Sequence, residues 1–347
     1  MNQIKQQGQP SRQSGSQRRP VISIIDWKVA PVSEPASLVE HEVIGEAADI
    51  RYHRMTHCDD FTPEVLATDA LILWHNIPVT ATGIARLQRC KAIVRNGVGF
   101  DTVDIAAAAR QGIAVCNVPD YGTEEVADHA IALALALVRQ LFPLDAVAKR
   151  CEWSIPDMDK LRRLSELNFA VIGLGRIGTA TALRARSLGF NVIFYDPYLP
   201  NGSHKAIGVK RASTLTELLR QADVVSVHCP LNAETHHLLG RQELALLRPT
   251  AYVVNPARAR VIDKAGILEA LPSGQIAGAG LDVIEHEPLR SVEEARVPNL
   301  IATCHAAFCS RESRREMRAT SARIALAAVT GRPLENVVNK VEDPMTS

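Results

Sequence analysis

The sequence predicts an α/β fold made of two doubly wound parallel-sheet domains. Short runs of β-branched residues alternate with segments of helical spacing over residues 21–116, and the same alternation returns over residues 167–303. A chain in which each strand is followed by a helix builds a parallel sheet that is covered by helices. The length of 347 residues also favours two domains over one.

The first series contains four strands and two helices. We expect strands at 21–25, 70–74, 92–95 and 113–116, and helices at 80–87 and 101–110. Gly112 follows the second helix, and glycine commonly ends a helix in the left-handed conformation. Pro119 and Gly122 then mark a turn at which the series ends.

A long helix is expected from Glu124 to about Leu141, with Thr123 as its N-cap. Its Ala- and Leu-rich sequence is apolar on nearly every face. We therefore expect the helix to be buried, either within the fold or against a second subunit.

The second series contains six strands, four helices and a closing helix. Strands are expected at 167–172, 191–195, 224–228, 251–255, 276–282 and 300–303, and helices at 180–188, 215–221, 241–247 and 263–271. The final helix runs from Glu312 to about Val329 and is closed by Gly331.

Composition excludes several classes of function. Thirty-nine basic residues against 38 acidic ones give a net charge of +1, and aromatic residues make up only 4% of the chain. The chain therefore lacks the positive field and the stacking surface that nucleic-acid binding uses. The longest apolar run, residues 130–138, is far shorter than the roughly 20 residues that cross a bilayer. We expect no nucleic-acid or membrane partner.

The termini and cysteines indicate a cytoplasmic protein. Residues 1–19 are polar, and we expect them to form a disordered tail rather than a secretory signal. The seven cysteines include no CxxC pair, which favours a reducing compartment. The spacing of Cys304, His305 and Cys309 fits no common zinc pattern, so no metal is expected.

A glycine-rich loop opens the second series. Gly173, Gly175 and Gly178 form a GxGxxG pattern directly after the strand 167–172, and Asp196 ends the next strand. In a Rossmann-type unit these glycines permit the turn, the approach of a pyrophosphate and close helix–strand packing, while the helix N-terminus attracts phosphates. An acid after the second strand binds ribose hydroxyls and repels a 2′-phosphate, so NAD is predicted over NADP.

Because this loop comes so late, the first 120 residues are expected to supply a substrate domain. The predicted arrangement is nested: a Rossmann-type NAD-binding domain at 121–311 is inserted into a flavodoxin-like substrate (catalytic) domain made of 20–120 and 312–347.

Six motifs stand in order between residues 93 and 308, and they carry a resemblance to a known family that runs from about residue 21 to residue 340. They are IVRNGVGFD (93–101), GLGRIGTATALRARSLGFNVIFYDPYLP (173–200), HCPLN (228–232), VNPARARVID (254–263), GLDVIEHEP (280–288) and CHAAF (304–308). With these motifs the chain resembles the D-isomer-specific 2-hydroxyacid dehydrogenase family, and it is most similar to the branch that includes the C-terminal binding protein corepressors.

The resemblance implies three catalytic residues, Arg258, Glu287 and His305. Arg258 would hold the carboxylate and carbonyl of a 2-keto acid with its fork of donors. His305 would give a proton to the carbonyl oxygen as hydride arrives at carbon, and would take it back in the reverse direction. Glu287 would bind the imidazole and stabilise its charged form. The implied activity is NAD-dependent interconversion of a 2-keto acid and a D-2-hydroxy acid.

The same matching implies the binding residues. The cofactor residues are Gly173, Gly175, Arg176, Ile177, Gly178, Asp196, Cys229, Pro230, Asn232, Pro256, Ala257, Asp282 and Thr123. Asp282 would meet the nicotinamide carboxamide, and Thr123 is explained equally well by a phosphate contact or by an N-cap. The substrate residues are Arg95, Asn96, Gly97, Val98, Gly99, Trp74, His75, Tyr121 and Phe308, with the backbone N–H groups of residues 96–99 facing the carboxylate.

The chain departs from the family pattern at five positions. Ala259 and Arg260 stand where a Gly-Gly pair is usual, so the backbone after Arg258 is uncertain, and Arg260 either faces solvent or meets an acidic substrate. Pro256 replaces a frequent Thr, Cys304 a usual Pro, and Phe308 the corepressor branch's Trp. The smaller ring would enlarge the substrate pocket.

A second function stays open at this point. Like the corepressors, the protein could be an NADH-responsive interaction dimer with little or no turnover. The three catalytic residues favour the enzyme, with a small 2-keto or 2-hydroxy acid as substrate and a homodimer as the expected assembly.

Overall fold

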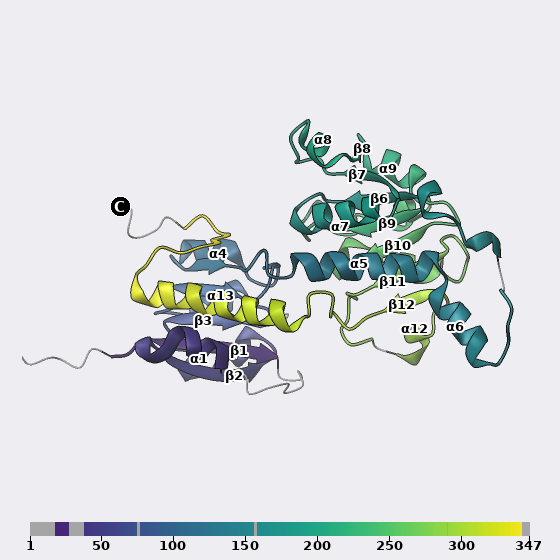
Figure 1. The fold of residues 1–347 in the computed structure, drawn as a ribbon. Helices are drawn as coiled ribbons and strands as arrows, with labels where there is room; N and C mark the ends of the chain where they lie inside the picture. Colours follow the sequence, from purple (N-terminus) through teal and green to yellow (C-terminus); the bar gives the residue numbers. More distant parts are fainter. Residues whose placement is uncertain (1–17, 28–37, 75–76, 156–157, 290, 342–347) are drawn as a thin grey trace, which may run out of the picture. The chain divides into compact units, whose positions relative to one another are not determined.

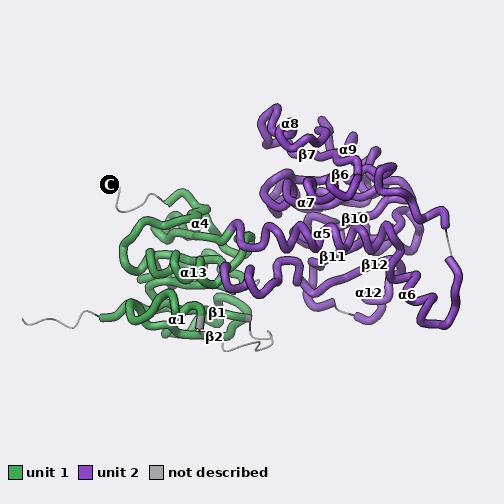
Figure 2. Tube along the Cα trace, viewed as in Figure 1, with its two compact units in different colours: residues 1–118, 318–347 green, residues 119–317 purple. Residues whose placement is uncertain are grey.

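The computed structural model describes residues 18–27, 38–74, 77–155, 158–289 and 291–341. The chain divides into two compact units, which Figure 2 shows in two colours: residues 1–118 with 318–347 form unit 1, and residues 119–317 form unit 2. The second division falls inside the last helix, α13 (Arg311–Thr330), which therefore contributes to both units. The sequence prediction places the boundary at 311/312, so that all of this helix except Arg311 belongs to the substrate domain.

The predicted N-terminal tail is described only at its end. Residues 1–17 lie outside the described residues. Arg18 is exposed and donates a hydrogen bond to the carbonyl of Ala67 at 3.3 Å, and Arg19 lies 3.3 Å from a carboxylate oxygen of Asp49.

Unit 1 is built on a five-stranded parallel sheet. Its strands are β1 (Val21–Trp27), β2 (Asp49–Met55), β3 (Ala70–Leu73), β4 (Ala92–Arg95) and β5 (Ala114–Cys116), in the order β2-β1-β3-β4-β5. This flavodoxin-like order reverses between β1 and β3, and open α/β sheets bind ligands outside the carboxyl ends of the strands at such a reversal.

Helices cover both faces of the unit 1 sheet (Figure 1). Ala70 and Ile72 of β3 pack in one apolar cluster with α13 and with α1 (Leu38–Ile44). Leu71 and Leu73, which point to the opposite face, pack in a second cluster. Its helices are α2 (Pro63–Leu66), α3 (Ala81–Ala85) and α4 (Ile105–Arg110). Alternation along one strand thus divides the core into two layers.

Three elements of unit 1, α1, α2 and β2, are absent from the sequence prediction. β2 is an edge strand with the sequence DIRYHRM, and only Met55 at its end is buried. An exposed edge strand needs no apolar run, so the pattern used to find the other strands does not occur there.

Unit 2 is built on a seven-stranded parallel sheet. Its strands are β6 (Asn168–Ile172), β7 (Asn191–Tyr195), β8 (Lys210–Arg211), β9 (Val224–Val227), β10 (Tyr252–Asn255), β11 (Gly278–Leu281) and β12 (Leu300–Ala302), in the order β12-β11-β10-β9-β6-β7-β8. This is the Rossmann order extended by one strand. The predicted fold class, two doubly wound parallel sheets, is confirmed.

Two helical layers enclose this sheet as well (Figure 1). One apolar cluster joins the sheet to α5 (Thr123–Val138) and α7 (Arg176–Ser187). The other joins it to α9 (Leu215–Gln221), α10 (Arg241–Leu244) and α11 (Lys264–Ala270). The remaining helices of unit 2 are α6 (Leu141–Lys149), α8 (Ser203–Ile207) and α12 (Val292–Ala295).

The long helix α5 differs from its prediction at both ends. Its N-cap position is Gly122, no side chain caps it, and Thr123 is its first helical residue, so the prediction that Thr123 is the N-cap is wrong. At the other end Gln140 adopts a left-handed conformation with φ +53°, which ends the helical path before Leu141. The chain then turns into α6.

Within the described ranges, no single helix has the length and apolarity needed to span a membrane. The pair α5 and α6, bent by 57°, passes only when both helices are taken together, and only by length and composition.

Candidate active site

The carboxyl ends of the unit 2 strands bring the predicted cofactor and catalytic residues to one edge of one sheet. β7, β6, β9, β10, β11 and β12 are neighbours in that order. They are followed in turn by Asp196, Gly173, Cys229, Arg258, Asp282 with Glu287, and His305. The cofactor candidates stand around the reversal between β6 and β9, where dinucleotides bind, and the catalytic candidates follow the next three strands.

The three glycines have different surroundings. Gly173 has φ +86°, and a Cβ there would lie 2.9 Å from the backbone nitrogen of Cys229. A Cβ on Gly178 would lie 2.0 Å from the carbonyl oxygen of Gly173, so only glycine fits. A Cβ on Gly175 would meet nothing within 4 Å. The first and third glycines are thus required by the fold, whereas the second leaves open space at the N-terminus of α7, beside the exposed Arg176.

Asp196 is tied to the glycine loop. One carboxylate oxygen accepts a hydrogen bond from the backbone N–H of Leu174 at 2.9 Å, and the other accepts from the N–H of Tyr198 at 3.0 Å. Arg211 donates to the backbone carbonyl of Asp196 at 2.7 Å and not to its carboxylate. The carboxylate therefore stands fixed at the end of β7, where it can accept from ribose hydroxyls.

The residues present fit a dinucleotide. Beyond the open space at Gly175, the hydroxyl oxygen of Thr123 is buried and has no hydrogen-bond partner within the described residues. Buried hydroxyls are normally hydrogen-bonded, and this one stands in the first turn of α5, where free N–H groups attract anions. The structure thus removes the N-cap explanation of Thr123 and leaves the phosphate contact as a prediction.

The segment after β9 combines two half-buried residues, His228 and Cys229, with two exposed ones. Burial raises the pKa of the Cys229 thiol to about 11 and lowers the pKa of His228 to about 3, and Ser226 lies 2.8 Å from Nε2 of that neutral ring. Pro230 and Asn232 are exposed, and the side-chain oxygen of Asn232 accepts from the N–H groups of residues 234 and 235.

The turn that carries Arg258 is clamped by Asn255, which is 1% exposed. The side-chain oxygen of Asn255 accepts from the N–H of Ala257 at 3.0 Å, and its amide donates to the carbonyl of Arg258 at 2.9 Å. Pro256 is buried and Ala257 is half-buried within this turn. The half-buried Arg258 side chain donates to the Ala257 carbonyl at 2.8 Å.

The departure from Gly-Gly after Arg258 causes no backbone conflict. Ala259 and Arg260 belong to a short 3-10 turn (Ala259–Val261), and neither has a positive φ. Arg260 is exposed, and its Nε lies 3.9 Å from a carboxylate oxygen of Glu285. Glycine is therefore not needed here, and the arginine pairs with the loop that follows β11.

His305 and Glu287 form the central polar pair. Nδ1 of His305 lies 2.9 Å from a carboxylate oxygen of Glu287, and both side chains are about one-third to one-quarter exposed. His305 has φ +55°, a left-handed conformation that is uncommon for residues other than glycine. The loop around it must therefore be held by other contacts.

Asp282 holds that loop. Its carboxylate, in a residue only 1% exposed, accepts from the N–H of Ala306 and the N–H of Ala307, both at 2.9 Å. Its backbone carbonyl accepts from the N–H of His305, also at 2.9 Å. Thr303 donates to the same carboxylate at 2.6 Å. Asp282 thus fixes the turn of His305, while its predicted contact with nicotinamide stays a prediction.

Two aromatic rings lie beside the histidine. The rings of Tyr121 and Phe308 meet edge to face with centroids 6.0 Å apart, and Phe308 also lies edge to face with His305 at 6.3 Å. A Cβ on Gly122 would lie 3.3 Å from Cβ of Phe308, so this ring packs against the turn before α5. The structure therefore brings Tyr121, Phe308 and His305 together from two distant segments.

In unit 1, Trp74 and Arg95 stand at the carboxyl ends of β3 and β4. The N–H of Trp74 donates to the carbonyl of Ile25 at 2.9 Å, which places Trp74 at the reversal of the strand order. The buried Arg95 donates to the carbonyls of Leu73 and Asn96 at 3.3 and 2.7 Å. His75 lies outside the described residues.

The loop of residues 96–99 differs in detail from its prediction. The N–H groups of Asn96 and Gly97 donate to the carbonyls of Leu73 and Arg95, both at 2.8 Å. Val98 and Gly99 are half-buried, and the carbonyl of Val98 accepts from the Asn117 side chain at 2.7 Å. Because the N–H groups of Asn96 and Gly97 are used within the fold, backbone donation to a substrate carboxylate stays a prediction for Val98 and Gly99 alone.

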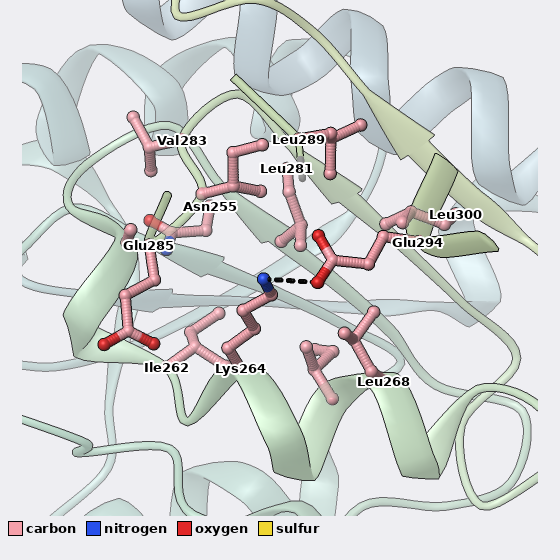
Figure 3. Close-up of a pocket in the computed structure, with 13 residues that line it drawn as sticks. Asn255, Ile262, Lys264, Leu268, Leu281, Val283, Glu285, Leu289, Glu294 and Leu300 are labelled. Carbon is pink, nitrogen blue, oxygen red and sulfur yellow. Dashed lines mark hydrogen bonds and ion pairs between the residues drawn. The ribbon is translucent and has the colours of Figure 1, made fainter. Parts of the chain in front are cut away.

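One apolar cavity lies beneath the catalytic loops (Figure 3). Its walls include Asn255, Ala259 and Glu285 from the two loops, and Lys264 donates to Glu294 at 2.8 Å across it. Its volume is about 20 Å³, which is room for roughly one water molecule. This cavity is therefore part of the packing under the loops and cannot hold a keto acid.

The described ranges hold one group of potential metal ligands, and it does not include Cys304 or Cys309. His57, Cys58 and Asp59 have ligand atoms within 4.8 Å of one another. Nδ1 of His57, however, accepts a hydrogen bond from the N–H of Asp59 at 3.1 Å. That lone pair is therefore already used, and the group is explained as the cap of a 3-10 turn.

The sequence prediction missed the residues that hold the site in place. They are Asn255, Thr303 and Asn117, whose contacts are given above, together with Ser321, which donates to Asn96, and the paired Glu40 and Arg318. Asn255 adjoins the NPAR segment and could have been found there, since an asparagine before a turn commonly bonds to the following backbone. The others act across long stretches of sequence and leave no local pattern.

Comparison with known proteins adds independent support. A family model described as D-isomer specific 2-hydroxyacid dehydrogenase, NAD binding domain, matches residues 131–307. The chain is 34% identical over 290 residues to the glyoxylate reductase of Thermococcus litoralis, which covers 82% of this chain and 87% of that protein. It is also 32% identical over 313 residues to the D-3-phosphoglycerate dehydrogenase of Methanocaldococcus jannaschii, covering 90% of this chain but only 60% of that longer protein.

Among solved structures, the D-lactate dehydrogenase of Aquifex aeolicus in complex with NAD and lactic acid is similar, with a TM-score of 0.80 and 27% identity. That match covers 90% of this chain and 96% of the other. These findings confirm the predicted family and its cofactor. Because the family model spans about half of the chain and the glyoxylate reductase matches over most of its own length, the chain belongs to the D-isomer specific 2-hydroxyacid dehydrogenase family, with its NAD-binding domain in unit 2.

Proposed function

We propose that this protein interconverts a 2-keto acid and a D-2-hydroxy acid with NAD, using His305 as the proton donor and acceptor. The observation that carries this proposal is the 2.9 Å contact between Nδ1 of His305 and Glu287. This contact lies at the same edge of the unit 2 sheet, formed by the carboxyl ends of its strands, as Arg258 and the glycine loop.

The His305–Glu287 contact sets the direction of proton exchange. A carboxylate accepts a hydrogen bond, so the Nδ1 atom that faces Glu287 carries a proton, and Nε2 is the atom left to exchange one with substrate. Bound NADH would supply hydride to the substrate carbon.

Arg258 is proposed to bind and orient the keto acid. Its guanidinium can hold a carboxylate and a carbonyl oxygen with parallel donors, and Asn255 holds its backbone in place. In unit 1, Arg95 and the N–H groups of Val98 and Gly99 are proposed as donors to a substrate carboxylate. Trp74, Tyr121 and Phe308 would contact the substrate's side chain.

The activity is tested by incubating the purified protein with NADH and glyoxylate, pyruvate or hydroxypyruvate, and following NADH absorbance. We expect turnover of at least one of them. If NADH binds but none of these keto acids, nor a wider panel, is reduced, the proposed activity is wrong and the interaction-dimer alternative is favoured.

Asp196 is proposed to set the preference for NAD. Replacement Asp196→Ala removes the acceptor for the ribose hydroxyls and the charge that repels a 2′-phosphate, so the ratio of kcat/KM for NADH to that for NADPH should fall about 10- to 100-fold. An unchanged ratio in the two steady-state assays would exclude Asp196 as the anchor.

A homodimer is proposed through the apolar surface of α6 and the segment after it. Of the 11 large apolar side chains that are exposed in the described residues, five lie here: Leu141, Phe142, Trp153, Ile155 and Met158. Trp153 is 96% exposed and borders a hollow of about 370 Å³ lined by Leu144 and Val147. Exposed apolar side chains that gather in one segment often mark an interface.

Replacement Trp153→Ser should shift the protein from dimer to monomer in light scattering coupled to size-exclusion chromatography. Replacement Tyr198→Ser, which removes another exposed ring of unit 2, serves as the control and should leave the mass unchanged. A monomeric wild type would contradict the proposed assembly.

A further inference from the structure

Trp74, a predicted substrate residue, lies against a buried ion pair. The guanidinium carbon of Arg318 stands 5.7 Å from the centre of the Trp74 ring. Glu40 of α1 holds this guanidinium with two contacts, Nε to Oε1 at 2.9 Å and Nη2 to Oε2 at 2.5 Å. Arg318 is 6% exposed and Glu40 is 1% exposed. The orientation of this arginine is therefore fixed by a bidentate partner.

Asn96, which opens the second predicted substrate element, is held by the same helix. The hydroxyl of Ser321 donates to the side-chain oxygen of Asn96 at 2.7 Å, and both residues are buried. The adjacent carbonyl of Asn96 accepts from Arg95 at 2.7 Å. Ser321 thus reaches the loop of residues 96–99 and, through Asn96, the arginine beside it.

Arg318 and Ser321 are three residues apart on α13 and therefore lie on one face of the helix. One helix face contacts both segments that end β3 and β4, at the place where the strand order of unit 1 reverses. Ala322 and Ala325 of the same helix pack against these strands in the core, so the face is seated rigidly.

We propose that Arg318 and Ser321 are positioning residues for substrate binding, Arg318 by orienting Trp74 and Ser321 by orienting Asn96. Neither residue is assigned contact with the substrate. The buried pair Glu40–Arg318 fits this role, because a buried ion pair contributes little net stability compared with apolar residues of the same shape but fixes one geometry. A planar guanidinium against a tryptophan face restricts the tilt of that ring.

The inference rests on the proposed function, so its test separates the two. Variants Arg318→Met and Ser321→Ala are assayed as full-length protein with NADH and the keto acid that the wild type reduces best. We expect the KM for the keto acid to rise at least fivefold in each, while kcat and the KM for NADH change less than twofold, because the NAD-binding domain lies in unit 2.

Two controls separate positioning from stability. Thr320→Ala removes a neighbouring hydroxyl on α13 that accepts from Arg323 at 2.7 Å and touches neither predicted substrate element, so its kinetics should match the wild type. The double variant Glu40→Leu with Arg318→Met replaces the ion pair by apolar side chains and should regain the melting temperature that Arg318→Met loses. Its KM for the keto acid should nevertheless stay raised.

Double-mutant cycles test the route. If Arg318 acts through Trp74, then Arg318→Met should have no further effect on KM in a Trp74→Ala background, and Ser321→Ala should have none in an Asn96→Ala background. Additive effects in either cycle, or a KM that returns to the wild-type value in the stability-restored double variant, would overturn the inference for that residue.

Binding of oxamate to the NADH-loaded protein is measured in parallel by calorimetry, because it needs no turnover. Weaker oxamate binding in both variants would support the positioning role even if no keto acid were reduced, in which case only the proposed activity would fail. Equal oxamate affinity in wild type and variants, or no oxamate binding to either, would overturn the positioning role.

Discussion

The two units hold their candidate functional residues by different means. In unit 2, side chains bond to backbone groups that follow within about 25 residues: Asn255 clamps a turn two and three residues ahead, and Asp282 holds a loop about 24 residues later in the chain. In unit 1, side chains from a distant helix do it, since Ser321 and Asn96 are 225 residues apart and Arg318 and Glu40 are 278 apart. The candidate catalytic residues of unit 2 are thus held by contacts close in sequence, whereas the candidate substrate residues of unit 1 are held by contacts that form only when α1 and α13 pack on the sheet.

This contrast predicts that variants of unit 2 act mainly on catalysis and cofactor binding. The largest effect is expected for His305→Gln, which removes the proton donor but keeps a polar side chain. The kcat should fall about 10²- to 10⁴-fold, with NADH affinity nearly unchanged in a fluorescence titration. Loss of NADH affinity instead, with residual kcat, would place His305 in cofactor binding and break the contrast within unit 2.

The next effect separates two glycines of the same loop. Gly178→Ala places a Cβ 2.0 Å from a backbone oxygen, so it should lower the melting temperature and abolish NADH binding together. Gly175→Ala has open space around the new methyl group and should fold normally, yet bind NADH at least about tenfold more weakly, because the methyl group occupies the approach of the pyrophosphate. Calorimetry and thermal unfolding check both. Equal NADH affinity in Gly175→Ala and wild type would contradict the assigned cofactor position.

The contrast also explains what the sequence could predict. The parallel sheets and the glycine loop follow from short patterns, in which β-branched runs mark buried strands and glycines mark a turn where no side chain fits. The three candidate catalytic residues follow from the resemblance to the family, and their roles stay predictions. The edge strand β2 was not predicted because its sequence is polar. The prediction of Thr123 as an N-cap is wrong because Gly122 takes that position. The contacts of Glu40, Arg318 and Ser321 were not predicted for another reason, because they form only when α1 and α13 pack on the same face of the sheet.

One buried asparagine in each unit allows the same substitution to be compared between the two units. Asn255→Ala releases the turn of Arg258, and Asn117→Ala releases the carbonyl of Val98. Each variant loses hydrogen bonds of a buried side chain, which should lower the free energy of unfolding by about 1–3 kcal/mol. Asn255→Ala should lower kcat roughly tenfold, whereas Asn117→Ala should raise the KM for the keto acid severalfold with kcat retained. Steady-state kinetics distinguishes them, and identical kinetic patterns would show that the units do not divide the work in this way.

The smallest effect concerns stability in acid and is confined to unit 2. Burial lowers the pKa of His228 to about 3, below its ordinary value of 6.5, so the unfolded chain binds a proton in a window where the folded protein does not. The contribution of this neutral ring to stability is therefore complete above about pH 6.5 and is lost progressively as the pH falls toward the folded-state value.

In His228→Gln this component is absent, so its melting temperature should fall less than that of the wild type between about pH 7.5 and pH 5. Carboxylates that titrate in the same range affect both proteins alike, which makes the difference between the two curves the informative quantity. If the melting temperatures of the two proteins fall equally with pH, protonation of His228 does not destabilise the fold. The ring would then be more open to water than its contact with Ser226 indicates.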